Sequence, residues 1–101
     1  MSPSWPPILV LGRDTCEDTV RSNAHLTERE IPFMYRNVDL DAEADTLIRY
    51  HNAGNRVTPT ILIGDPGRPE LVVVEPSNED LDAAIAAVNG AVSIGVASPQ
   101  T

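Results

Sequence analysis

The stretch ILVLGRDTC, residues 8 to 16, decides the fold. Its first four residues are all apolar, which is typical of a strand covered on both faces, and a glycine ends the run. Thr15 then provides a helix N-cap with Asp18 three residues later, and Pro32 ends the predicted helix. A strand therefore leads into a helix, with the only cysteine, Cys16, in its first turn.

Working outward, hydrophobic spacing predicts the remaining elements. In the first helix, which is expected to run to about Glu30, Val20, Ala24 and Ile31 keep helical spacing with Thr27 between them, as on a helix face that packs on the core. The later elements are a strand at 33–38, a helix capped by Asp41 and followed by Gly54, strands at 60–63 and 71–74, and a helix capped by Ser77 and closed by Asn89-Gly90.

This order predicts an α/β fold, βαβ followed by ββα. A helical crossover makes the first strand pair parallel, and a six-residue Gly/Pro turn makes the last pair antiparallel. We expect one mixed four-stranded sheet with helices on both faces. Residues 1–7 are an extended lead-in, 8–89 the domain and 90–101 a flexible tail.

Composition excludes several classes of function. The chain has 101 residues, room for one domain, and a net charge of −8, which is the wrong sign for nucleic acid. No apolar run is long enough to span a membrane, and the first seven residues lack the features of an export signal. One cysteine allows no internal disulfide, so the expected location is the cytoplasm.

The environment of Cys16 bears on its reactivity. Exposed N–H groups and the positive dipole end of a helix favour a thiolate, although most lone cysteines are small buried hydrophobes. The acidic residues Glu17 and Asp18 oppose ionisation of the thiol; one carboxylate about 6 Å from the sulfur costs the thiolate about 1.4 kcal/mol. The helix dipole and Arg13 favour the thiolate by about the same amount. We expect a pKa near the ordinary value or modestly below it.

A second feature, Thr58-Pro59-Thr60, places a proline at the start of the third strand, and the residues alone predict an ordinary trans bond there. A strand ending in Gly-x-x-x-Cys, this Thr-Pro pair and an acidic, Ser/Asn-rich start of the last helix together resemble the glutaredoxin family. The stretches 52–60 and 74–78 look most like its actinobacterial mycoredoxin branch. The resemblance covers about residues 8 to 89 and implies a thioredoxin-like fold.

The resemblance also implies roles. Cys16 matches the nucleophile, and Pro59 matches a cis-proline that brings the Thr58 backbone beside it, where Thr58 can pair with a bound thiol peptide. Arg13, Ser77 and Asn78 match positions that bind the carboxylates of the small thiol. No bound cofactor or metal is implied. Mycothiol or glutathione would be the co-substrate and oxidised protein thiols the partners. With mycothiol, these carboxylate-binding roles would not carry over.

The sequence departs from the family at the second cysteine. The usual Cys-x-x-Cys reads Cys16-Glu17-Asp18-Thr19, so any catalysis must be monothiol. The predicted function is a monothiol thiol-disulfide oxidoreductase that reduces protein mixed disulfides with a low-molecular-weight thiol. The alternative is a non-catalytic thioredoxin-fold module that binds proteins, and a third option is an iron–sulfur cluster carrier.

Other polar residues favour structural interpretations. The acidic residues between Asp39 and Asp45 lack the spacing of a calcium loop, so a helix cap and a solvated face are preferred. His25 and His51 are interpreted as solvated. Arg56 either borders the thiol site or is an exposed turn residue.

Overall fold

A computed structural model describes residues 5–97, which form four strands and three helices. In chain order these are β1 (Ile8–Gly12), α1 (Glu17–Glu28), β2 (Met34–Asn37), α2 (Ala42–His51), β3 (Thr60–Ile63), β4 (Leu71–Val74) and α3 (Asn78–Ala97). The strands make one sheet in the order β2-β1-β3-β4. No helix in this described part is long and apolar enough to cross a membrane.

The sheet is mixed, as predicted. β1 and β2 are parallel, with Val10 opposite Tyr35, and the β1–β3 and β3–β4 pairs are antiparallel. β1 lies between two neighbours, and all five of its residues are buried. The apolar run therefore forms a strand covered on both faces, and the α/β prediction of βαβ followed by ββα is confirmed.

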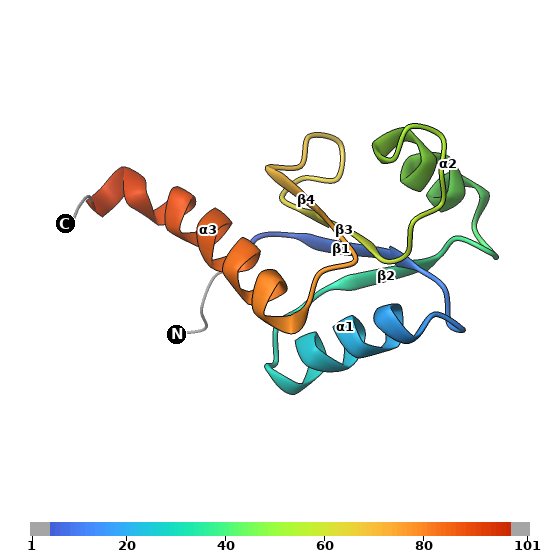
Figure 1. The fold of residues 1–101 in the computed structure, drawn as a ribbon. Coiled ribbons are helices and arrows are strands. Elements are labelled where there is room, and N and C mark those ends of the chain that lie inside the picture. Colours follow the sequence, from blue (N-terminus) through green and yellow to red (C-terminus); the bar gives the residue numbers. More distant parts are fainter. Residues whose placement is uncertain (1–4, 98–101) are drawn as a thin grey trace.

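Alternate residues of the central strands supply two separate cores. Ile8 and Val10 belong to a cluster with Leu26 of α1 and residues of α3. Leu9 and Leu11 point the other way and pack against Ala44 and Ile48 of α2. Figure 1 shows the same arrangement, with α1 and α3 on one face of the sheet and α2 on the other. Helices cover both faces, as the sequence predicted.

The start of α1 differs from the prediction. Cys16, and not Thr15, is the N-cap, because the Cys16 N–H bonds the Arg13 carbonyl at 3.1 Å and residues 13–16 form a turn before the helix. The buried face is also different: the buried residues of α1 are Thr19, Ser22 and Leu26. Val20 is 53% exposed and Ala24 is exposed as well. The small polar residues, and not the apolar pair, fit against the sheet.

Gly12 explains this choice of face. A Cβ built at Gly12 would lie 2.5 Å from Cγ2 and 2.6 Å from Oγ1 of Thr19. Only a residue without a side chain lets the first turn of α1 approach the end of β1 so closely. The Thr19 hydroxyl also accepts a long hydrogen bond of 3.4 Å from the Arg13 N–H. Together these contacts fix the turn that carries Cys16.

The other helix ends match the sequence except at the C-terminus. Asp41 accepts a hydrogen bond from the Ala44 N–H, and Ser77 accepts one from the Asp80 N–H, so both predicted caps are confirmed. Gly54 has a φ of 91°, the left-handed conformation expected of a glycine after a helix.

The predicted end of the last helix at Asn89-Gly90 is wrong, because α3 continues to Ala97 and projects beyond the sheet (Figure 1). Gly90 and Gly95 both lie inside this helix; an internal glycine costs only about 1 kcal/mol relative to alanine, so Gly90 does not by itself end it. β2 is one residue shorter at each end than predicted. Parts of the predicted lead-in and tail, residues 1–4 and 98–101, lie outside the described range.

Candidate functional site

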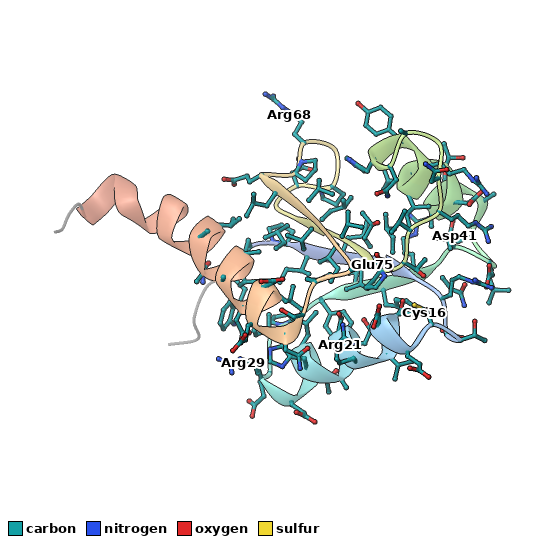
Figure 2. The ribbon with its side chains drawn as sticks, viewed as in Figure 1. Cys16, Arg21, Arg29, Asp41, Arg68 and Glu75 are labelled. Carbon is teal, nitrogen blue, oxygen red and sulfur yellow. The ribbon has the colours of Figure 1, made fainter. Side chains whose placement is uncertain are left out.

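Three connections of the chain meet around Cys16. β1 and β2 are parallel, so the connections that follow them leave the same edge of the sheet, and the Val38 N–H bonds the Gly12 carbonyl at 2.9 Å across them. The connection before β3 reaches this edge as well, because β3 runs antiparallel to β1 and Thr60 pairs with Leu11. Figure 2 shows Cys16 at one end of α1 and Arg29 at the other.

The sulfur of Cys16 faces the residue before Pro59. Its Sγ lies 3.5 Å from the Thr58 carbonyl oxygen, and the thiol donates to it. The Thr58–Pro59 bond is cis, as the resemblance implied and contrary to the expectation from the residues alone. Cys16 is partly exposed and unpaired, so the hydrophobic-core alternative for this cysteine does not hold. Residues 42 positions apart thus form one site.

The pKa of Cys16 lies below its ordinary value of 9.0. Partial burial is the largest single influence and raises the pKa, but several hydrogen bonds to the sulfur outweigh it. They come from the side chains of Thr58 and Thr19 and from the N–H groups of Thr19 and Asp18 at the start of α1. The thiol makes no full capping hydrogen bond, yet these helix N–H groups still favour the thiolate.

The acidic pair beside Cys16 is partly neutralised. Asp18 Oδ1 is 2.7 Å from the Arg21 guanidinium, one turn along α1. The same guanidinium donates to the Pro76 carbonyl at 3.1 Å, in the connection between β4 and α3. Arg21 therefore offsets one of the two charges that oppose ionisation and ties α1 to the start of α3.

Arg13 does not point freely into the site. Its Nε lies 2.9 Å from one oxygen of Asp39, and Arg56 lies 2.8 Å from the other oxygen. Arg56 also pairs with Asp45 at 2.6 Å, and Asp45 with Arg49 at 3.1 Å. The sequence left open whether Arg56 borders the thiol site or is an exposed turn residue. In the structure it is part of this chain of ion pairs, at the edge of the sheet that carries Cys16.

Tyr35 adds a further polar contact. Its hydroxyl donates to Asp14 at 2.7 Å. Burial and this hydrogen bond raise the pKa of Tyr35 far above its ordinary value, so the phenol stays protonated. The negative charges of Asp14, Asp39 and Cys16 raise the pKa of Tyr35 in the same direction.

The predicted residues at the start of α3 are placed as follows. Ser77 is exposed and caps the helix, so its hydroxyl is engaged by the Asp80 N–H. Asn78 is half-buried, and its side-chain oxygen is buried without a hydrogen-bond partner in the described structure. Arg21 links this segment to the helix that carries Cys16 through the carbonyl of the preceding Pro76.

A large apolar cavity lies away from these residues. It has a volume of about 700 Å³ and is lined by Trp5, Phe33, Leu47 and neighbouring prolines at the start of β1. The sulfur is at the opposite end of that strand, so this cavity plays no part in chemistry at Cys16. Within the described range, no group of His, Cys, Asp or Glu side chains is arranged to hold a metal ion.

Sequence reasoning missed the partners of the site residues. Thr19 hydrogen-bonds the sulfur of Cys16, Arg21 pairs with Asp18, and Asp39 pairs with Arg13. No motif in the sequence marks these pairings. Thr19 carried the strongest signal, because it occupies the position of the second cysteine, three residues after Cys16. The pairing of Asp39 with Arg13 joins residues 26 apart and has no local signature.

Known proteins match this chain through structure. No protein-family model matches it, and no curated protein sequence matches it. A mutant of the thioredoxin-like protein BC3987 is similar with a TM-score of 0.61 and 24% identity, over 75% of this chain and 95% of that one.

Two further solved structures cover 93% of this chain. A glutaredoxin from Brucella melitensis matches with a TM-score of 0.57 and 19% identity over 92% of its length. Actin interacting protein 5 matches with a TM-score of 0.52 and 20% identity over 93% of its length. The chain therefore has the thioredoxin-like fold that glutaredoxins also have.

Proposed function

We propose that this protein is a monothiol thiol-disulfide oxidoreductase of the glutaredoxin type, with mycothiol or glutathione as co-substrate. The observation that carries the proposal is the sulfur of Cys16 at the start of α1, partly exposed and 3.5 Å from the Thr58 carbonyl beside a cis-proline. A helix N-terminus favours the thiolate, which is the reactive form. The backbone before Pro59 offers a strand-like edge to a bound thiol peptide.

The proposed reaction uses two exchange steps. The Cys16 thiolate attacks the small-thiol sulfur of a protein mixed disulfide, forms a disulfide with the small thiol and releases the protein thiolate, which takes a proton from water. A second small-thiol thiolate then attacks the small-thiol sulfur of this adduct, which releases Cys16 and leaves the disulfide of the small thiol. Overall, the protein thiol is released, and the small-thiol half of the mixed disulfide leaves with one small thiol from solution as the small-thiol disulfide.

The residue at the second cysteine position supports the monothiol route. Thr19 is 1% exposed and packs against Gly12, and a threonine cannot displace a small thiol from Cys16. The adduct therefore needs a thiol from solution for its resolution, and the rate should depend on the concentration of that thiol.

The test is turnover of a mixed disulfide between a peptide and glutathione or mycothiol. Wild type should release the peptide thiol catalytically, and Cys16→Ser should reduce the rate to that of the free small thiol. A matched control combines Cys16→Ser with Ala24→Cys, which places one thiol at an exposed position two turns along the same helix. We expect no catalysis from it. A wild-type protein without turnover, or a control of equal rate, would contradict the proposal and favour the non-catalytic binding module.

A further inference from the structure

One carboxylate lies between two arginines, Arg13 and Arg56, at the edge of the sheet that carries Cys16. Asp39 binds Arg13 through Oδ2 at 2.9 Å and Arg56 through Oδ1 at 2.8 Å, so both of its oxygens are engaged. Arg13 lies three residues before Cys16, whose N–H bonds the Arg13 carbonyl at 3.1 Å. Two guanidinium groups converging on one carboxylate form the usual protein site for an anion, and here the anion belongs to the chain itself.

Asp39 is held in this place by its own backbone. Its N–H donates to the Asn37 side chain at 2.8 Å, which fixes the turn after β2. The preceding residue, Val38, is buried and tied to Gly12 at 2.9 Å, and its carbonyl accepts from Arg56 at 3.3 Å. The backbone that carries this carboxylate is therefore fixed by hydrogen bonds on both residues.

The pairing changes the charge that a ligand meets. Arg13 and Arg56 would attract a carboxylate, but Asp39 cancels one positive charge, and Asp45, itself shared with Arg49, binds Arg56 at 2.6 Å. Asp14, two residues before Cys16 and hydrogen-bonded to Tyr35 of β2 at 2.7 Å, adds a further negative charge. An incoming carboxylate would have to displace Asp39 and would meet these acidic groups.

We propose that Asp39 is a specificity-determining residue. It excludes small thiols that carry a carboxylate close to the sulfur and favours small thiols that are uncharged there. The inference rests on the proposed function and narrows its co-substrate to a small thiol without a carboxylate close to its sulfur. Removal of this one carboxylate should convert the site to one that binds anionic thiols.

The test compares reagents that differ only in charge. Cys16 is the only cysteine, so alkylation by anionic iodoacetate and by neutral iodoacetamide reports on this site alone. Both reagents react with the thiolate, so the ratio of the two rates does not depend on the fraction of Cys16 that is ionised. Asp39→Asn should raise the ratio about threefold at low ionic strength, and the increase should shrink with salt. Glu28→Gln, at the other end of α1, makes the same change in net charge and should leave the ratio unchanged.

A second variant protects the test against misfolding of the first. Arg13→Gln leaves Asp39 less neutralised and should lower the ratio, opposite to Asp39→Asn. In turnover, wild type should use glutathione diethyl ester more efficiently than glutathione, and Asp39→Asn should reverse or abolish this preference.

The outcomes separate the two proposals. Turnover with an unchanged preference, or equal alkylation ratios in wild type and both variants, would overturn the role of Asp39 and leave the proposed function standing. Absence of turnover together with the expected ratios would overturn the proposed function but retain Asp39 as the residue that sets the charge of the site. A Cys16 that neither reagent alkylates would overturn both.

Discussion

The contact between Gly12 and Thr19 gives a sharp prediction, because it positions the turn that carries Cys16. In Gly12→Ala the new methyl group would lie 2.5 Å from Thr19 Cγ2 and 2.6 Å from its Oγ1. Ordinary contacts between such atoms are about 3.5–4 Å. One side must therefore move by about 1 Å. Thr19 is 1% exposed and lies inside the contact between the two elements, so we expect α1 to shift away from β1.

The size of the effect follows from overpacking. Insertion of a methyl group into a close-packed site costs about 1–3 kcal/mol. We expect Gly12→Ala to lower the free energy of unfolding by about 2 kcal/mol, toward the middle of that range. Because Cys16 begins the helix that shifts, its hydrogen bond to the Thr58 carbonyl should weaken as well, and its reactivity should change.

The measurement is urea denaturation of four proteins in a double-mutant cycle. Thr19→Ala removes both close atoms, so Gly12→Ala should cost at least 1 kcal/mol less in that background than in wild type. Gly90→Ala serves as the control, because a Cβ at Gly90 meets nothing within 4 Å, and it should stabilise α3 by about 0.5–1 kcal/mol. A cost below about 0.5 kcal/mol for Gly12→Ala, or no coupling to Thr19→Ala, would refute the close-approach explanation.

Three further predictions concern caps, acid stability and the thiol. Ser77→Ala removes the hydroxyl that caps α3 and should lower the free energy of unfolding by about 1 kcal/mol, and an unchanged urea midpoint would contradict the cap. Arg36 holds the pKa of Asp41 below its ordinary value of 3.8, so the unfolded chain binds a proton more readily than the folded one. This contribution to stability is present above about pH 4 and is lost as the pH falls through the folded pKa, so the stability difference between wild type and Asp41→Asn should shrink between pH 5 and pH 3. Thr19→Val removes a hydrogen bond to the sulfur and should raise the pH midpoint of iodoacetamide alkylation of Cys16; a midpoint that stays constant or falls would count against that contact.

The sheet could be read from the sequence because its signals are local. The residues at 60–63 and 71–74 are apolar runs bounded by Gly, Pro and acidic residues, and β3 and β4 occupy these ranges. The connections also fixed the directions of the strands, since a helical crossover between β1 and β2 makes them parallel.

The face of α1 could not be read in the same way. The helical spacing of apolar residues predicted that Val20 is buried. In the structure, the close approach at Gly12 buries the face with Thr19 and Ser22 instead. Small side chains fit where a helix lies near a strand, and that distance depends on the rest of the fold. Hydrophobic periodicity contains no information about it.

The candidate site could likewise be predicted only where its signals are local in the sequence. The sulfur at the helix start could be predicted, because strand, glycine and cysteine follow one another in the chain. The pairing of Arg13 with Asp39 could not, because many carboxylates were available to Arg13 in an acidic sequence and only the fold selects one. The cis bond before Pro59 was implied by family resemblance and by nothing in the residues themselves.

Arg21 has a mechanical consequence for the way α1 and the β4–α3 connection are held together. Its guanidinium spans from Asp18 to the Pro76 carbonyl, at 2.7 and 3.1 Å. One side chain thus links the helix that bears the sulfur to the turn that leads into α3. Arg21→Lys keeps the positive charge but has a single nitrogen in place of the guanidinium fork, so it would loosen this link.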